Sequence, residues 1–399
     1  MKKIDTLIVC FVALWMTGLP VHAQIAVKGE KVYTSAGAPI ENGVVLIKNG
    51  KIDRVGPEGR VNIPSGYKVM EAAIVTPGFI DAHTTLGLTG ITNQSDDQDV
   101  LDRANAIQPE LRAIDAYNGR DPLVAYLRDW GITTVHTGHG PGALISGQTM
   151  IVKTYGETID DAVLVPSKML AFTMTSGVRR NYSKPGTRSK GMAMLRQELI
   201  KAQTYLEQRK KGEIKAIDLK KEALADLLEG KLTALVSAHK ANDIMTAVRL
   251  KKEFGFSMVL DGAAEAYLVM DELKSEDIPV VIHPARIRAG GDAKNASFET
   301  AYKLDEAGIP VAFQSGYEAY VPKVRVVSFE AAINAANGLG MERTLELMTI
   351  GAANLLGIQN QVGSLETGKD ADVVLFDGDP FEYTTHVTGV IVNGKVVKE

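Results

Sequence analysis

The sequence predicts an α/β protein in which a (β/α)8 barrel of the TIM type carries a β-sandwich satellite domain built from both termini. Short apolar runs alternate with longer stretches of helical periodicity through the middle of the chain, as in strands joined by helical crossovers. Both ends show short apolar runs separated by turn signals. The chain is also long enough for one large domain and a smaller companion. The predicted boundaries are 24–74 and 351–399 for the two parts of the sandwich and 75–350 for the barrel.

Residues 1–23 have the pattern of a signal peptide. Lys2 and Lys3 precede an apolar stretch that is shorter than the roughly 20 residues of a membrane span, and small residues surround a cleavage site after Ala23. The only cysteine, Cys10, lies in this stretch, so the mature chain would have no thiol, which suits an oxidising compartment. The sequence therefore predicts a secreted, periplasmic protein that is not anchored in the membrane after cleavage. Lipid modification of Cys10 is the alternative.

The charge balance argues against two classes of partner. The formal net charge is -4 at pH 7, so no basic field favours nucleic acid or an anionic membrane. We therefore expect a small-molecule or short-peptide substrate. A homo-oligomer is compatible with the sequence, which does not determine the oligomeric state.

The two ends of the chain are predicted to be β-structure. Gly43–Gly56 contains Asn49-Gly50 between two apolar runs, and Val387–Glu399 contains Asn393-Gly394 in the same setting. Asn-Gly is the strongest short signal for a hairpin, because both central residues of that tight turn need positive φ. Pairing of the two ends would build the satellite domain.

The middle of the chain contains eight candidate strands with helical runs between them, the first of these running from Pro109 to Trp130. Eight such units form an α/β barrel whose active site lies at the carboxyl ends of the strands. An open doubly wound sheet is the alternative, but no glycine-rich phosphate loop follows the first strand. The candidate strands are Ala73–His83, Thr133–Thr137, Thr149–Thr154, Met169–Phe172, Ala234–Ala238, Met258–Leu260, Val280–His283 and Val311–Gln314.

Histidines gather at the predicted carboxyl ends of these strands. Imidazole is a common ligand for zinc-like metals, and three or four such groups with an open position could hold a single ion that activates water. A lone histidine at a strand end is more often a hydrogen-bonded structural group, so the inference depends on convergence. The five histidines at this rim are His83, His136, His139, His239 and His283, whereas His386 lies in the C-terminal β segment.

Three stretches carry a family resemblance. "TPGFIDAH" follows the N-terminal β segment, "VSAHKANDIMTAVRLKKEFGFSMVLDGAAEAY" lies in the middle, and "TIGAANLLGIQNQVGSLETGKDADVVLFDGDP" lies near the end. Together they resemble the amidohydrolase superfamily, and within it the imidazolonepropionase-like group. The resemblance implies a metal-bearing barrel with a β-sandwich, and hydrolysis of C–N bonds in cyclic amides, amidines or peptides by metal-activated water.

Only two of the six positions that hold metal ligands in that family have a matching residue in this sequence. His83 and His239 occupy the positions of ligands on the first and fifth strands. Two imidazoles cannot hold a pair of divalent ions, so we do not expect a binuclear site of the usual type. The other four ligand positions hold Thr85, Thr173, Gly262 and Gly316.

Two hypotheses follow. In the first, a relocated site binds one zinc-like ion through His83 and His239 with one or more of His136, His139 and His283, and Asp261 is a carboxylate ligand or the base. If Asp261 is a ligand, His283 or His139 serves as the catalytic base. In the second, the chain is an inactive binding protein that keeps the pocket and has lost the metal centre.

Two basic residues near the predicted rim are candidates for binding the substrate. Lys153 lies at the end of the third predicted strand, and Arg286 follows the seventh. Either side chain could hold a substrate carboxylate, although an ordinary salt bridge is the simpler role for Lys153.

Overall fold

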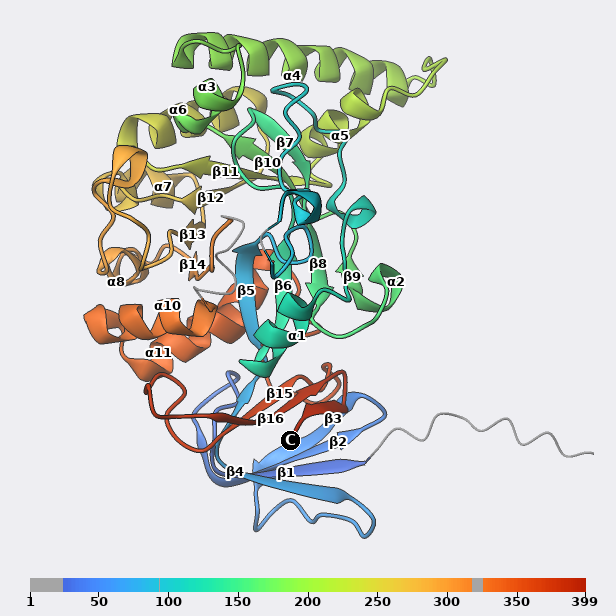
Figure 1. Cartoon of the computed structure of the whole chain (residues 1–399), viewed down its shortest axis with the longest axis vertical. Coiled ribbons are helices and arrows are strands. Elements are labelled where there is room, and N and C mark those ends of the chain that lie inside the picture. Colours follow the sequence, from blue (N-terminus) through green and yellow to red (C-terminus); the bar gives the residue numbers. More distant parts are fainter. Residues whose placement is uncertain (1–23, 93, 318–325) are drawn as a thin grey trace, which may run out of the picture.

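The computed structural model describes residues 24–92, 94–317 and 326–399, which form a mixed α/β structure (Figure 1). The predicted signal peptide lies outside the described residues. Within the described ranges, no helix combines the length and the apolar character that crossing a membrane requires.

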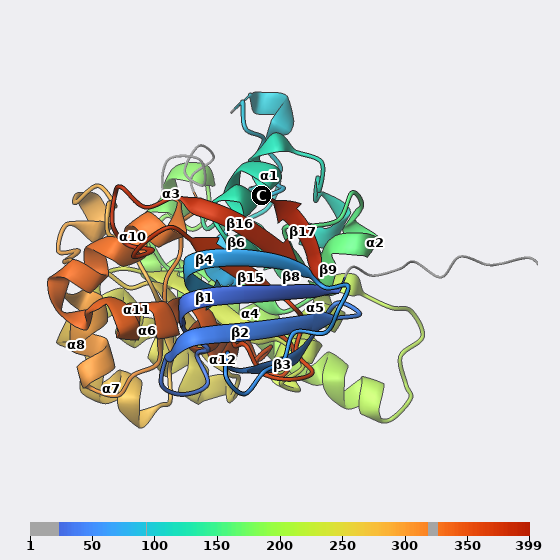
Figure 2. The same ribbon diagram turned by 90° about the horizontal axis from the view of Figure 1, so that it is seen from below.

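The strands of both termini form one seven-stranded sheet in the order β17-β16-β15-β4-β1-β2-β3, where the sequence predicted a sandwich (Figures 1 and 2). Both predicted Asn-Gly turns are present. Asn49 and Gly50 have φ of 52° and 79°, and Asn393 and Gly394 have φ of 50° and 72°. These left-handed values allow the strands to reverse tightly. The strands are β1 Ile25–Val32, β2 Ile40–Lys48, β3 Lys51–Pro57, β4 Lys68–Pro77, β15 Val373–Phe376, β16 Val387–Val392 and β17 Lys395–Lys398.

The middle of the chain forms two further sheets, one of order β14-β13-β12-β11-β10-β7 and one of order β5-β6-β8-β9. Backbone hydrogen bonds join their edges. The Ala82 amide donates to the Phe313 carbonyl oxygen at 3.0 Å, and the Thr149 amide donates to the Met169 carbonyl oxygen at 2.8 Å. The strands are β5 Phe79–Thr84, β6 Ile132–Thr137, β7 Ile145–Gln148, β8 Met150–Lys153, β9 Val163–Val165, β10 Met169–Thr173, β11 Thr233–Ala238, β12 Met258–Gly262, β13 Val280–Ile282 and β14 Val311–Ala312.

The third predicted strand runs in the opposite direction to its neighbours, so the expectation of eight parallel strands is wrong at this position. His136 on β6 pairs with Ile151 on β8 in antiparallel register, and β7 pairs with β10 in the same way. The connection before β7 spans only residues 138–144. A parallel strand needs a crossover of about a dozen residues or more, so this short link forces the chain to turn back. Lys153 therefore lies at the end opposite to the carboxyl ends of the parallel strands.

Helices cover the outer side of these sheets (Figure 1). The run predicted as helical from Pro109 to Trp130 forms an α-helix only from Pro122. There the Asp121 side chain accepts a hydrogen bond from the Leu123 amide at 2.7 Å and caps the first turn. The helices include α1 Pro122–Asp129, α2 Ile159–Ala162, α3 Gly177–Asn181, α4 Arg188–Lys210, α5 Leu219–Leu228, α6 Ala241–Phe254, α7 Met270–Ser275, α8 Thr300–Glu306, α10 Val327–Asn334, α11 Met341–Glu346 and α12 Ala352–Leu356.

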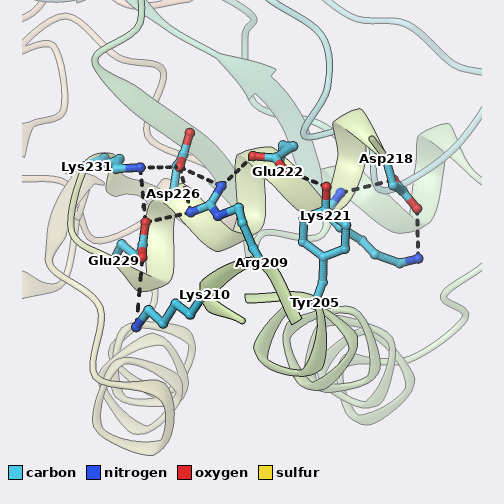
Figure 3. Close-up of polar contacts among 9 residues, drawn as sticks. All are labelled: Tyr205, Arg209, Lys210, Asp218, Lys221, Glu222, Asp226, Glu229 and Lys231. Carbon is cyan, nitrogen blue, oxygen red and sulfur yellow. Dashed lines mark hydrogen bonds and ion pairs between the residues drawn. The ribbon is translucent and has the colours of Figure 1, made fainter. Parts of the chain in front are cut away.

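An ion-pair network braces α4 against α5 at the end of the molecule far from the terminal sheet (Figures 1 and 3). The Arg209 guanidinium contacts Glu222, lies 3.2 Å from Asp226 and lies 2.6 Å from Glu229. The Tyr205 hydroxyl donates to Glu222 at 2.5 Å. These groups are partly exposed, so each pair contributes little free energy, but the network orders the two helices.

Candidate active site

A buried histidine and aspartate meet at the carboxyl ends of β5 and β12. His83 Nδ1 donates to Asp261 Oδ1 at 2.9 Å, and the two residues are 1% and 0% exposed. Because a carboxylate only accepts, Nδ1 carries a proton, and in the neutral form of the ring the lone pair therefore lies on Nε2. His83 Nε2 is buried and has no hydrogen-bond partner among the described residues. The pair thus presents one open nitrogen lone pair at the end of the strands.

Asp261 is held by donors from two strands and from the segment after β14. It accepts hydrogen bonds from His83, from the Ser237 hydroxyl, and from Gln314 Nε2 at 2.8 Å. Burial raises the pKa of the Asp261 carboxyl, but the imidazole of His83 and these hydrogen bonds outweigh burial and leave the pKa below its usual range. Asp261 is therefore an ionised acceptor that orients His83, and the sequence-based prediction that it acts as a base itself does not fit these contacts.

His239 and Tyr317 lie beside this pair. His239 Nε2 is 3.3 Å from the Tyr317 hydroxyl, and the Tyr317 ring centroid is 5.8 Å from that of His83. His239 is 6% exposed and follows β11, as predicted. The structure thus places the two histidines that match family ligand positions around the same tyrosine.

His136 is occupied on both ring nitrogens. Nδ1 donates to the Ala82 carbonyl oxygen at 2.8 Å, and Nε2 lies 2.6 Å from the Thr149 hydroxyl. Burial lowers the pKa of His136 to about 3, so the ring is neutral. Its contacts tie β5 to the reversed third strand, which makes it a structural histidine and not the metal ligand that was predicted.

His283 and His139 have surroundings of their own. His283 Nδ1 donates to the Pro284 carbonyl oxygen at 2.9 Å, and Nε2 lies 3.4 Å from the Thr300 hydroxyl, so the predicted catalytic role finds no open nitrogen. His139 packs against the backbone at Gly147, where a Cβ would lie 2.7 Å from His139 Nδ1. Burial lowers the pKa of both rings, for His283 to about 4.

The four positions at which the resemblance places the other ligands form part of the local structure. Gly262 has φ of 79°, and a Cβ there would lie 2.7 Å from His239 Cε1. Gly316 has φ of 101°, which L side chains rarely adopt. The Thr173 hydroxyl accepts the Gly142 amide at 2.9 Å, and Thr85 contacts the Thr89 hydroxyl at 3.4 Å. A histidine at 262 or an aspartate at 316 would require a different backbone.

A metal centre of the family type does not fit these residues. Across residues 24–92, 94–317 and 326–399, no three His, Cys, Asp or Glu side chains are placed to share an ion. The ring centroid of His136 lies 5.8 Å from that of His83, but both ring nitrogens of His136 already have protein partners. The four predicted ligands therefore do not form one site in the described structure.

Lys153 cannot bind substrate at the carboxyl ends of the strands, because the reversed direction of β8 carries it to the other end. Its ammonium group is 3.2 Å from Asp370 and contacts Asp372 directly, and Lys153 is 3% exposed. The ordinary salt-bridge role is the one that the structure shows.

Arg286 is likewise committed to a carboxylate of the protein. Its Nε donates to Glu330 Oε1 at 2.7 Å, and its backbone amide donates to Glu330 Oε2 at 2.8 Å. Glu330 is 1% exposed, so Arg286 compensates a buried charge on α10. The predicted contact with a substrate anion would compete with this pair.

Three residues of the site escaped the sequence analysis, namely Ser237, Gln314 and Tyr317. Ser237 stands two positions before His239 on one strand, and alternate residues of a strand share a face. Gln314 stands at the predicted end of the eighth strand. Both signals were present, but uncharged polar residues are too common at strand ends to stand out without a partner.

Comparisons with known proteins agree with this architecture. The amidohydrolase family matches residues 319–397. Amidohydrolase tasK of Hapsidospora irregularis is 24% identical over 413 residues, which cover 92% of this chain, whereas the match spans 41% of that relative's length. An imidazolonepropionase of Brucella suis is 26% identical over 412 residues, covering 89% of this chain and 91% of the relative.

A solved structure extends the likeness to three dimensions. The crystal structure of an amidohydrolase from Thermotoga maritima is similar with a TM-score of 0.87 and 28% identity, over 94% of this chain and 99% of that one. The motifs, the fold and these relatives agree with one another. Over most of its length the chain is similar to amidohydrolases and imidazolonepropionases.

Proposed function

We propose that this chain is a secreted hydrolase of C–N bonds in small amides, cyclic amides or short peptides. The observation that carries the proposal is the buried His83–Asp261 pair, whose Nε2 is open at the carboxyl ends of the strands. Active sites of α/β barrels lie at that end. An amidohydrolase-type barrel is supported by the backbone hydrogen bonds that join the edges of the sheets and by the TM-score of 0.87.

The open nitrogen of His83 marks where a reactant would bind. Leaving a buried polar atom without a partner costs roughly 1–3 kcal/mol, so such atoms in native proteins usually meet water, an ion or a ligand. A neutral imidazole that is fixed in one tautomer by a carboxylate is suited to accept a proton from water. This is the proton transfer that amide hydrolysis requires.

An apolar pocket that is linked to the pair through Met174 and Ser237 supports a preference for substrates with an apolar group. The amide of Met174, a pocket residue, donates to the Ser237 carbonyl oxygen at 2.9 Å, and the Ser237 hydroxyl donates to Asp261. Apolar pockets with a few polar groups are the usual form of small-molecule sites. The apolar walls of the pocket include Leu144, Val178, Pro185, Met192 and Leu195.

Turnover of a small substrate library tests the proposal. Cyclic amides and dipeptides with apolar or charged side chains are incubated with the purified protein, and released amine or carboxylate is measured. We expect hydrolysis of an apolar member that is lost in His83→Ala, with the circular dichroism spectrum unchanged. Hydrolysis that persists in His83→Ala would show that the reaction takes place elsewhere.

A binding protein without catalysis is the second candidate, and the replaced ligand positions favour it. Gly262 and Gly316 adopt backbone conformations that exclude the family's histidine and aspartate. Calorimetric titration separates the two candidates, because a binding protein would show saturable heat with an amide that it never cleaves. We rank this candidate second because the His83–Asp261 pair keeps a group able to move a proton.

Export to the periplasm is part of the proposal. Its support is the basic start of the chain, followed by an apolar stretch and small residues near Ala23. Expression of the full chain in a Gram-negative host, fractionation and N-terminal sequencing test it. A mature chain that starts at Gln24 in the periplasmic fraction is the expected result.

A further inference from the structure

We propose that this site works without a divalent ion, with His83 Nε2 as the general base and Asp261 as the residue that positions it. The inference rests on the proposed hydrolase function and concerns how the reaction is carried out. It departs from the water activation by metal that the family resemblance implied.

The backbone is the first reason. At Gly262 and Gly316 the chain has φ of 79° and 101°, values that disfavour any residue with a Cβ. A side chain at Gly262 would also collide with His239, whose Cε1 lies 2.7 Å from the ideal Cβ position. The backbone conformation at both positions therefore suits glycine and disfavours the histidine and the aspartate that the family resemblance would place there.

The use of the remaining donors is the second reason. The Thr173 hydroxyl accepts an amide at 2.9 Å, and both ring nitrogens of His136 and His283 have protein partners. Within the part of the chain that the structure describes, no trio of His, Cys, Asp or Glu could share an ion. His83 and His239 alone offer fewer than the three protein ligands that a catalytic zinc needs.

The shape of the Asp261 environment is the third reason. Donors from β5, from β11 and from the segment after β14 converge on this one buried carboxylate. The arrangement holds His83 in the tautomer with the proton on Nδ1, as carboxylates do for bases in metal-free hydrolases. Gln314 strengthens the hold, because its Nε2 also lies 2.9 Å from the Ile282 carbonyl oxygen.

The reaction then balances without a further reactant. His83 Nε2 accepts a proton from water while the water oxygen bonds to the amide carbon, and the carbonyl electron pair moves to its oxygen. Tyr317, which lies over His83, is the neighbouring hydroxyl that can donate to that oxygen. When the C–N bond breaks, its electron pair leaves with nitrogen, which takes the proton from His83. The products are a carboxylic acid and an amine.

Metal content provides a readout that is independent of activity. The purified full chain is incubated separately with zinc, manganese and ferrous iron, dialysed, and analysed by elemental mass spectrometry. We expect far less than one ion per chain, and the same value for His83→Ala. One ion per chain that is lost in both His83→Ala and His239→Ala would overturn the inference.

Activity of the metal-free protein tests the role of the base. With the best substrate of the library, we expect the rate to survive chelation, to fall about 10²–10⁴-fold in His83→Ala, and to recover in part with added imidazole. His386→Ala is the matched control, because His386 is exposed and pairs with Asp377 in the C-terminal segment. A residue with a merely structural role would not be rescued by imidazole.

The outcomes separate this inference from the proposed function. Hydrolysis that disappears on chelation and returns with a metal would overturn metal independence and leave the hydrolase assignment intact. Absence of hydrolysis for the whole library, with saturable binding of an amide, would overturn both the hydrolase assignment and the role of His83 as a base. Chelator-resistant turnover with imidazole rescue would support both.

Discussion

Two buried polar clusters lie at opposite ends of the central strands, and they differ in whether they are closed. At one end, Lys153 contacts Asp372 and Asp370, and Asp372 also accepts the Asn393 amide at 2.9 Å. At the other end, His83 contacts Asp261 but leaves Nε2 without a partner among the described residues. A cluster in which every polar group has a partner serves to hold elements together. A cluster with an unpaired polar atom can still bind a ligand or take part in a reaction.

The end that carries Lys153 is also where the terminal sheet meets the central strands. Asp372 comes just before β15, and the Thr133 hydroxyl on β6 contacts it at 3.4 Å. The cluster therefore joins the C-terminal segment to two central strands. Substitutions in the Lys153–Asp372 cluster should therefore reduce stability, whereas substitutions in the His83–Asp261 pair should reduce turnover.

The largest expected effect is on turnover, in Asp261→Asn. An asparagine amide can donate to Nδ1 and so favour the tautomer with the proton on Nε2, which removes the lone pair from the reacting side. We expect kcat to fall about 10²–10⁴-fold, measured by amine release from the best substrate. Ser237→Ala keeps the carboxylate and should lower kcat much less. Equal losses in the two variants would contradict the assigned role of Asp261.

The next effect is on stability, in Lys153→Met. Removing one partner of a buried ion pair leaves uncompensated charge, and we expect the free energy of unfolding to fall by about 3–5 kcal/mol in urea titrations. Lys51→Met is the control, because Lys51 pairs with the same Asp370 at 2.6 Å but its side chain is 52% exposed. The control should cost less than about 1 kcal/mol. Catalytic activity per folded molecule should remain unchanged in both variants.

A smaller loss of stability is expected in Gly262→His, which introduces the histidine that the family resemblance places at this position. The strained backbone alone should cost about 1–3 kcal/mol of unfolding free energy, and the collision with His239 adds to it. Gly255→His is the matched control, because Gly255 has φ of 75° but a Cβ there meets nothing within 4 Å. Thermal denaturation should rank Gly262→His as the less stable variant. Equal melting temperatures of the two variants would show that the backbone at position 262 accommodates a histidine.

The smallest effect concerns pH, at His136. Its pKa is lowered to about 3 by burial, whereas an unfolded histidine titrates near 6.5. Between these values the unfolded chain binds a proton that the folded chain does not, so stability falls as the pH is lowered from about 6.5 towards 3. Nitrogen chemical shifts should show a neutral ring with Nδ1 protonated down to about pH 4. A ring that titrates near pH 6 would indicate a more open position.

Much of the fold was predictable because local patterns determine it. The Asn-Gly pairs need left-handed backbone, and both turns form where they were expected. The run from Ala241 to Phe254 forms a helix, since its apolar periodicity is strong and Gly255 ends it in left-handed conformation. The reversed third strand was missed because strand direction depends on the length of the connection, which the apolar pattern does not reveal.

The candidate site was predictable in its location and not in its roles. His83, His239 and Asp261 do lie together at the carboxyl ends of the strands. The sequence could not show that both ring nitrogens of His136 and His283 would contact neighbouring groups. The partners are backbone carbonyl oxygens and threonine hydroxyls, and such groups are common in any chain.

The sequence by itself determined the resemblance to amidohydrolases and the position of the histidines at the predicted rim, because these properties reside in residue identity and order. Only the tertiary structure decided which polar groups remain open. Asp261 meets His83 across 178 positions of the chain, and Lys153 meets Asp372 across 219. Whether a buried polar group has a partner depends on such distant contacts. At one end of the strands Lys153 is fully paired and stabilises the fold, whereas at the other end His83 Nε2 has no hydrogen-bond partner among the described residues.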